Sequence, residues 1–387
     1  MDSASIRAKV AQAARDLEEH GWAVIPDVLA PALATSILND VWATLEAVSR
    51  GRVQRANPST WRGQDFFKTM KGILMEPSNI YHAAPVWRAR QEVAPYFAHL
   101  YGDANLGTSF DRINIFPAPS AVGGRVQRVG PWLHTDQTPL RNGRLCVQGF
   151  IDFLGTGADD AGLIVADKSH LQHHDLLYKT WRIKEAKNWY KFTDDQRAYI
   201  EAHFELKKVH CPPRSLVLWD SRTFHQNTPP LANGHERFVI YVCMQPWAHL
   251  GSAKKIEAAK AKKRQAYAGQ RGTSHWPLFN TLFSRFARSF GQPIPDYKTD
   301  AATIQQPALD DPAHWRIAAM VGHTDGACVA KESFSAGEKP LLATHPELLL
   351  LNKKALLKLL GDKNDDDDDD SAKEEEERPQ KRARKED

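Results

Sequence analysis

Cysteine is scarce in this chain, which has four cysteines in 387 residues and no CxxC pair. Disulfide-stapled secreted domains and zinc fingers need more thiols at closer spacing, so both classes are disfavoured and a reducing compartment is indicated. No run of 18 or more apolar residues occurs, which argues against a membrane-spanning helix. The first 20 residues carry charges throughout and lack the apolar segment of a secretory signal. We therefore expect an intracellular protein without a membrane span.

The formal net charge of +4 hides an uneven distribution. Residues 362–387 contain 13 acidic and 7 basic residues, a net of −6, whereas the rest of the chain has 44 basic and 34 acidic residues, a net of +10. The final segment holds six consecutive Asp and four consecutive Glu. Like charges repel and bury nothing, so we expect this tail to be disordered, and its acidic run to be able to bind basic partners. Its closing basic cluster at 381–385 suits a nuclear-import signal or an ordinary solubilising tail, so nucleus and cytoplasm both stay open.

The hydrophobic period changes along the chain. Apolar residues recur at helical spacing over 3–20, 31–48 and 85–100, with a short strand expected at 21–27. From residue 111 onward the chain breaks into short β-type runs bounded by turn residues. These runs lie at 113–116, 144–151, 163–165, 215–219 and 238–244. The pattern predicts a mainly β protein, a barrel or sandwich with helical cover.

Four segments follow from this pattern. They are an N-terminal helical cover at 1–105, a β core at 106–250 with a helical insert at 171–206, a C-terminal helical extension at 251–361, and the charged tail at 362–387. The insert contains Trp181, Trp189 and Tyr190, for which core packing is the expected role and stacking on a nucleobase the alternative. The basic stretch at 253–264 is expected to be a solvated helix face.

Two short motifs carry candidate chemistry. His134 and Asp136 stand two residues apart in a stretch that favours a strand, so their side chains should point to the same face. His225 follows another strand-like run, close to its end. Two imidazoles and one carboxylate on one face of a metal are the protein ligands of non-haem Fe(II) oxygenases, although the same donors also bind Mn, Co or Ni. The sequence therefore predicts a metal site, with Fe(II) inferred from the expected chemistry.

Arg237 follows His225 by 12 residues. This spacing predicts a short loop and a return strand antiparallel to the one before, with the guanidinium pointing into the same barrel. A guanidinium can form two parallel hydrogen bonds with a carboxylate, so Arg237 is the natural partner for the far carboxylate of a 2-oxo acid co-substrate. Taken alone, Arg237 could instead be a surface cation beside Glu236, and a His-x-Asp triplet can arise by chance among 16 histidines. The remaining candidates are interpreted as structural or exposed: His82, His99, His170, His173, His174, His210 and His275.

These residues resemble the phytanoyl-CoA dioxygenase-like branch of the Fe(II)/2-oxoglutarate oxygenases. The resemblance runs from about residue 17 to residue 247. It rests on four stretches: 17–29, the motif at 134–136, the run at 162–170, and 218–225 followed by Arg237. The chain departs from the family at Asp167 and Lys168, which stand where Pro-Gly is usual. This departure puts a turn in question and leaves the metal site intact.

The resemblance implies a double-stranded β-helix (jelly roll) and an oxygenase that uses Fe(II), 2-oxoglutarate and O2. It would hydroxylate a C–H bond and release succinate and CO2. The implied roles are iron binding by His134, Asp136 and His225, binding of the 2-oxoglutarate C5 carboxylate by Arg237, and co-substrate contacts by Asn114 and Gln148, for which a hydrogen bond at the edge of the core is the alternative. Because Asp136 is present, the halogenating members of the family, which lack this carboxylate, are disfavoured.

The prime substrate carries no motif of its own. No pattern for a CoA pocket is present, so the family name does not identify it. A small-molecule or lipid-type substrate is the leading expectation. A nuclear oxygenase that acts on protein or nucleic acid is the alternative, motivated by the basic body and the tail. A non-catalytic barrel scaffold is a third possibility, which the complete set of ligands and Arg237 disfavours because a scaffold needs none of them.

Overall fold

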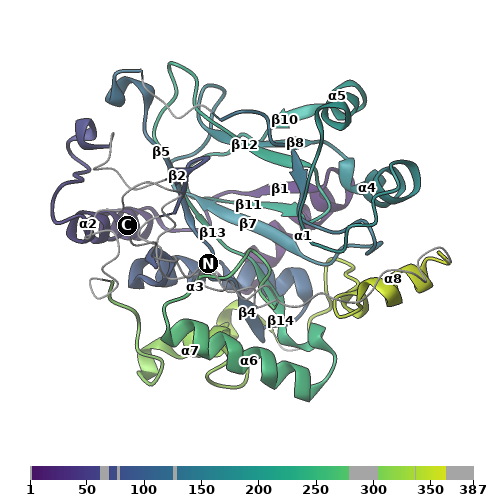
Figure 1. Cartoon of the computed structure of the whole chain (residues 1–387). Helices are drawn as coiled ribbons and strands as arrows, with labels where there is room; N and C mark the ends of the chain where they lie inside the picture. Colours follow the sequence, from purple (N-terminus) through teal and green to yellow (C-terminus); the bar gives the residue numbers. More distant parts are fainter. Residues whose placement is uncertain are drawn as a thin grey trace, which may run out of the picture.

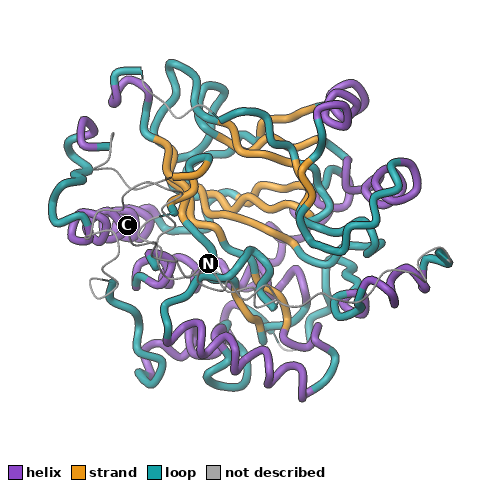
Figure 2. The backbone as a smooth tube through the Cα atoms, in the orientation of Figure 1, coloured by secondary structure: helices purple, strands orange, loops and turns teal. Residues whose placement is uncertain are grey.

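Two antiparallel sheets face each other at the centre of the molecule (Figures 1 and 2). The computed structural model describes residues 2–61, 69–75, 79–124, 129–278, 304–335 and 337–362. The larger sheet has the order β1 (Trp22–Ile25), β11 (Ser215–Asp220), β7 (Val147–Asp152), β13 (Arg237–Tyr241), β5 (Ile113–Phe116), β3 (Ile73–Leu74) and β2 (Thr69–Met70). The smaller sheet has the order β10 (Leu206–Lys208), β8 (Gly162–Ala166), β12 (His225–Thr228), β6 (His134–Thr135) and β9 (Tyr190–Lys191). The predicted fold class, a jelly-roll core with helical cover, is confirmed.

Alternation along the strands separates two hydrophobic cores. On β13, Phe238 and Ile240 join the large cluster beneath the helices, whereas Val239 joins a second cluster between the two sheets. That second cluster also contains Val165 of β8 and Val217 of β11, one from each sheet. Successive strand residues point to opposite faces, so every second residue of a central strand faces the space between the sheets. This rule puts Arg237 and Gln148 in that space.

Helices cover the outer face of the larger sheet. The N-terminal cover consists of α1 (Ser3–Glu19), α2 (Pro31–Val48) and α3 (Ala84–Tyr101), and α1 packs on both β1 and α3. In α1, Val10, Ala13 and Leu17 are buried at a helical spacing that makes one apolar stripe. Full burial of an aliphatic side chain is worth about 1.5–3 kcal/mol, so this stripe suffices to fix the helix on the sheet. The Asp2 carboxylate caps the helix by accepting a hydrogen bond from the Ser5 amide.

The insert between β8 and β11 is only partly helical. It contains α4 (Ser169–His174), which continues into a π-helical turn at Asp175–Thr180, and then α5 (Asp194–His203). Between them lies β9, which pairs with β6 and so extends the smaller sheet. The predicted helical insert is therefore incomplete, because one of its segments forms an edge strand beside His134.

The C-terminal extension packs on the same core as the N-terminal helices. The α-helices in its described residues are α6 (Ala253–Ala268), α7 (Trp315–Val321) and α8 (Lys353–Leu359). Ile317 and Met320 of α7 join the large cluster that also contains the buried side of α3. β4 (Leu106–Thr108) and β14 (Met244–Pro246) form a small sheet that contacts α7 through β4 and α3 through β14. Residues 363–387 lie outside the described part of the chain, so disorder and nuclear import of the tail stay predictions.

The connection from β12 to β13 links the two sheets. β12 pairs with β6 and β8 in the smaller sheet, whereas β13 pairs with β5 and β7 in the larger one. The loop at 229–236 therefore crosses from one sheet to the other. The sequence predicted a short loop and a return strand but not the sheet that this strand joins, and the buried side chain of Arg237 lies between the sheets as expected. Among the described helices, none is long and apolar enough to span a membrane.

Candidate metal centre

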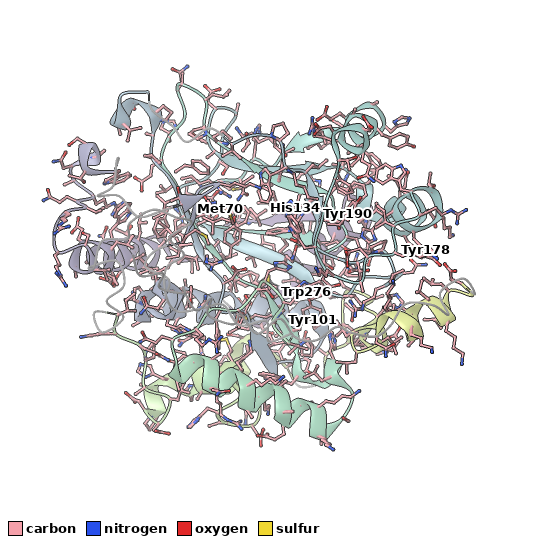
Figure 3. All side chains as sticks on the ribbon, in the orientation of Figure 1. Met70, Tyr101, His134, Tyr178, Tyr190 and Trp276 are labelled. Carbon is pink, nitrogen blue, oxygen red and sulfur yellow. The ribbon has the colours of Figure 1, made fainter. Side chains whose placement is uncertain are left out.

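His134, Asp136 and His225 converge between the two sheets. His134 begins β6 and His225 begins β12, and these two residues are paired across the strands. Nε2 of His225 lies 3.2 Å from Oδ2 of Asp136, and Nε2 of His134 lies 3.7 Å from Oδ1. All three side chains are buried, and one ligand atom from each lies within 4.8 Å of the others. His134 lies near the centre of the molecule in Figure 3. The arrangement fits three donors on one face of a metal ion.

Backbone hydrogen bonds orient both imidazoles in the same way. Nδ1 of His134 lies 3.2 Å from the carbonyl oxygen of Trp132, and Nδ1 of His225 lies 2.9 Å from that of Thr223. Each bond joins a histidine to the residue two positions earlier. A proton held on Nδ1 in this way leaves the lone pair of Nε2 directed at the centre. Both imidazoles are thus prepared as metal ligands by their own strands.

The protonation states of His134 and Asp136 favour the binding of a metal cation. Burial, with a smaller contribution from His225, lowers the pKa of His134 to about 3, so the ring is neutral at physiological pH. Burial alone would raise the pKa of Asp136, but the surrounding imidazoles of His275, His134 and His225 outweigh it and bring the pKa below its usual value. Neutral imidazole and ionised carboxylate are the forms that bind metals.

Two neighbours hold the ligands in place. Nε2 of Gln148 donates a hydrogen bond of 3.1 Å to Oδ2 of Asp136. The indole of Trp132 stacks on the ring of His134, with 4.4 Å between centroids and 17° between planes. Gln148, expected from the sequence to contact the co-substrate, thus lies at the centre and contacts a ligand carboxylate. Such outer contacts usually set ligand orientation and metal affinity.

Arg237 is a buried cation without a counter-ion. It is fully buried, and its guanidinium carbon lies 5.0 Å from the centroid of the Phe150 ring in the inter-sheet core. Nη1 donates a 2.8 Å hydrogen bond to Oδ1 of Asn114, whereas Nε and Nη2 have no hydrogen-bond partner. Within the described part of the chain it forms no ion pair. An unpaired buried charge costs several kcal/mol, so this arrangement suits an anion that arrives from outside. The two free donors fit a carboxylate, such as that of 2-oxoglutarate.

Lys71 is a second cation near the centre, and the sequence reasoning missed it. Its Nζ lies 3.3 Å from the centroid of the Trp132 ring. Burial, and then the nearby charge of Lys191, lowers the pKa of Lys71 to about 8. The carbonyl oxygen of Lys71 accepts a 3.1 Å hydrogen bond from Nδ2 of Asn114, so the β2–β3 turn is tied to the partner of Arg237. No motif surrounds Lys71, and only the pairing of β3 with β5 brings it here.

The aromatic residues of the insert have two different environments. Trp181 and Tyr190 pack against a buried cluster beside the smaller sheet, as expected. Trp189, by contrast, is 50% exposed, and its ring centroid lies 6.1 Å from that of His134. The predicted core role is therefore wrong for Trp189. Its exposed face beside a metal ligand can contact a substrate.

The remaining histidines that the sequence analysis named fall into three groups: structural, exposed and close to the metal centre. Those with a structural role are His82, His99, His170, His173 and His174, all buried and hydrogen-bonded to backbone or to Glu338. His210 is exposed. His275 does not fit either interpretation, because its Nε2 lies 3.8 Å from Oδ1 of Asp136. It belongs to the surroundings of the metal centre.

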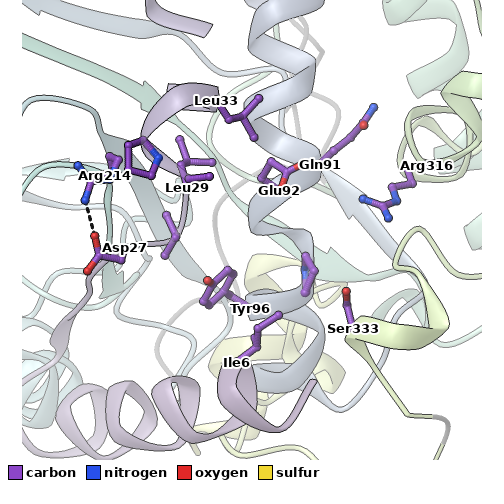
Figure 4. Close-up of a pocket in the computed structure, with 14 residues that line it drawn as sticks. Ile6, Asp27, Leu29, Leu33, Gln91, Glu92, Tyr96, Arg214, Arg316 and Ser333 are labelled. Carbon is purple, nitrogen blue, oxygen red and sulfur yellow. Dashed lines mark hydrogen bonds and ion pairs between the residues drawn. The ribbon is translucent and has the colours of Figure 1, made fainter. Parts of the chain in front are cut away.

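A separate hollow lies between α1, α3 and the segment after β1 (Figure 4). Its volume is about 420 Å³, and an ion pair of 2.6 Å between Arg214 and Asp27 stands at its edge. No histidine or cysteine lines it, and none of the metal-centre residues does so. The hollow is therefore independent of the candidate metal centre.

Comparison with known proteins agrees with this geometry. Residues 17–235 match the family model of phytanoyl-CoA dioxygenase (PhyH). The chain belongs to the PhyH family. A relative, Ava biosynthesis cluster protein O of Aspergillus versicolor, is 31% identical over 214 residues, which cover 52% of this chain and 67% of that protein. As a PhyH-family member, the protein is an Fe(II)- and 2-oxoglutarate-dependent oxidoreductase, and its triad is suited to hold the iron.

Two solved structures are similar to part of this chain. One is the non-haem α-ketoglutarate-dependent carbocyclase SnoK of nogalamycin biosynthesis, at 15% identity and a TM-score of 0.40, covering 61% of this chain and 83% of that chain. The other is the non-haem α-ketoglutarate-dependent epimerase SnoN of the same biosynthesis, at 9% identity and a TM-score of 0.38, covering 62% of this chain and 84% of that chain.

Proposed function

We propose that this PhyH-family protein hydroxylates a C–H bond of a small organic molecule and converts 2-oxoglutarate to succinate and CO2. The observation that carries the proposal is that the His134–Asp136–His225 cluster and the unpaired guanidinium of Arg237 face the same inter-sheet space. A metal ligand set and a carboxylate receptor that face the same space between the sheets are the two requirements for a 2-oxo acid that chelates a metal at one end.

Bound Fe(II) supplies the activation of dioxygen, and the protein supplies position and surroundings. His134, Asp136 and His225 would hold the ion on one face and leave the opposite positions for the co-substrate and dioxygen. The backbone hydrogen bonds to the two Nδ1 atoms orient the imidazoles, with each Nε2 directed at the centre. The surrounding side chains bury the centre and so exclude water from it.

The co-substrate would be fixed at its far end by Arg237. Its two free N–H donors would hold the C5 carboxylate, while Asn114 keeps the guanidinium in place through Nη1. Lys71 adds a second positive charge, which suits a dianionic co-substrate. The role of Gln148 changes relative to the sequence-based expectation, since it would act through Asp136.

The prime substrate would enter beside Trp189. The exposed indole next to His134 suits a molecule with a flat or apolar part, including a lipid-type chain. The name of the Aspergillus versicolor relative assigns that protein to a biosynthesis cluster, which favours a small molecule over a macromolecule for this chain. An exposed indole also suits a nucleobase, so salt-sensitive oligonucleotide binding that is lost in Trp189→Ala would instead favour a nucleic-acid substrate.

The direct test is succinate formation from 2-oxoglutarate when air is admitted to anaerobic, Fe(II)-loaded protein. We expect slow turnover without any prime substrate, and none in His225→Ala, which removes a ligand. His203→Ala is the matched control, because His203 is exposed on α5 and stacks on Tyr199. No 2-oxoglutarate binding and no succinate from wild-type protein would contradict the proposal and favour a scaffold.

A further inference from the structure

The segment at 271–276 returns from α6 to the metal centre and is held there by the core. The Thr273 amide donates to the carbonyl oxygen of Phe110 at 3.1 Å, and the Phe110 amide donates to Oγ1 of Thr273 at 2.8 Å. Trp276 is 3% exposed and packs with Leu145 and Cys146, directly before β7. This part of the C-terminal extension is thus a fixed wall of the centre.

The imidazole of His275 projects from this wall toward Asp136. Its Nε2 lies 3.8 Å from Oδ1 of Asp136, too far for a hydrogen bond. His275 is also not one of the three residues whose ligand atoms lie within 4.8 Å of each other. Its side chain is 25% exposed, against 5–7% for the side chains of His134, Asp136 and His225. His275 therefore stands on the more open side of the centre and is not a fourth ligand.

Nε2 of His275 is buried and has no hydrogen-bond partner. Nε2 of His82 and Nε2 of His173 have backbone partners, whereas Nδ1 of both rings lacks one, so an unpartnered ring nitrogen alone does not set His275 apart. What sets Nε2 of His275 apart is its position, 3.8 Å from a carboxylate oxygen of the candidate metal site. His275 thus combines a ring nitrogen without a partner, a partly exposed side chain and a backbone held by the core. Together these features indicate a side chain that binds a ligand.

We propose that His275 is a binding residue at the open face of the metal centre, where its Nε2 makes a hydrogen bond to the molecule that occupies the position left free by the three ligands and 2-oxoglutarate. The inference rests on the proposed function and adds to it a residue from the C-terminal extension. His275 lies 40 residues beyond the end of the PhyH match at residue 235. The extension is then part of the active site as well as part of the core.

Nitric oxide is the probe, because it is small and binds Fe(II) at an open position. Fe(II)-loaded, full-length protein is saturated with 2-oxoglutarate under nitrogen and titrated with nitric oxide, followed by electron paramagnetic resonance. Loss of one hydrogen bond is worth about 1 kcal/mol, so we expect His275→Phe to weaken nitric oxide binding about fivefold and to change the line shape. His275→Gln keeps an N–H donor and should bind within twofold of wild type. His323→Phe is the control, since His323 lies in the same extension and pairs with Asp310.

Three outcomes decide whether His275 has the proposed role. A changed line shape and weaker nitric oxide binding in His275→Phe, with iron and 2-oxoglutarate affinities within threefold of wild type, supports the inference. Unchanged nitric oxide binding and line shape overturn it. A loss of iron affinity above tenfold also overturns it, because His275 would then act by holding Asp136. Wild-type protein that binds no 2-oxoglutarate before nitric oxide is added refutes the proposed function instead, so the two failures are distinguishable.

Discussion

Replacing Arg237 by Met tests the proposed co-substrate site most sharply. Arg237→Met removes a buried charge but keeps most of the volume of the side chain. In the ligand-free protein this charge has no counter-ion, so its removal should leave the melting temperature unchanged or raise it. Binding of 2-oxoglutarate, by contrast, should be much weaker in the variant. Loss of one partner of a buried, hydrogen-bonded charge pair costs about 2–5 kcal/mol, which corresponds to a dissociation constant for 2-oxoglutarate about 30-fold to several thousand-fold higher.

The same substitution can be followed by thermal unfolding. A ligand present at 100 times its dissociation constant stabilises the protein by about 2.7 kcal/mol. If Arg237→Met raises that constant about 100-fold, the same concentration stabilises the variant by only about 0.4 kcal/mol. We therefore expect 2-oxoglutarate to raise the melting temperature of the wild-type Fe(II) protein clearly and that of the variant hardly at all.

The assay is an anaerobic titration of 2-oxoglutarate into the Fe(II) protein, read by its charge-transfer absorbance, beside the melting curves. Arg214→Met is the matched control, because Arg214 pairs with Asp27 at the edge of the separate hollow. A dissociation constant for Arg237→Met within threefold of wild type would refute the assignment of Arg237. A large fall in the melting temperature of the ligand-free variant would show that its charge is satisfied by the fold.

Three further outcomes are expected. Asp136→Asn should lower Fe(II) affinity by more than about 100-fold, measured as iron retained after dialysis, and full retention would exclude Asp136 as a ligand. Gln148→Leu should lower it about tenfold, since only the hydrogen bond to Asp136 is lost; an unchanged affinity would contradict that role. Burial lowers the pKa of His82 and His173 from 6.5 to about 3, so the folded protein binds fewer protons than the unfolded chain. Stability is then full above about pH 6.5 and falls with decreasing pH, by about 3 kcal/mol for the two residues together at pH 5.5; a melting temperature that does not fall from pH 7.5 to 5.5 would contradict this.

Local periodicity predicted the elements well where one face of the element is buried. The helix expected at 31–48 is α2, and the strand expected at 113–116 is β5. His134 and Asp136 were recognised as candidate ligands because the His-x-Asp motif is short and local, whereas the pairing of β12 with β6 brings His225 beside them. The same reasoning did not assign β12 and β13 to their sheets, since a 12-residue spacing suits a hairpin within one sheet as well as a crossover between two.

Residues brought to the centre by tertiary structure left no local signal. Lys71 arrives through the pairing of β3 with β5, and His275 through a loop that follows a basic helix. Trp189 was expected in the core because large aromatics are usually buried, yet the edge strand β9 exposes it beside His134. In each case the sequence shows a plausible side chain, but only the folded chain shows its neighbours.

The crossover between β12 and β13 has a consequence for how the enzyme can be damaged. His225 lies in the smaller sheet and Arg237 in the larger one, so a co-substrate bound to both the metal and Arg237 would span the distance between the two sheets. The separation of those walls is set by the apolar side chains packed between them, including Val165 and Val239. Protein interiors are close-packed, and a misplacement of about 1 Å can cost a large factor in rate. A substitution of an aliphatic core residue that contacts neither metal nor co-substrate can therefore reduce the catalytic rate, because it changes the distance between the two sheets.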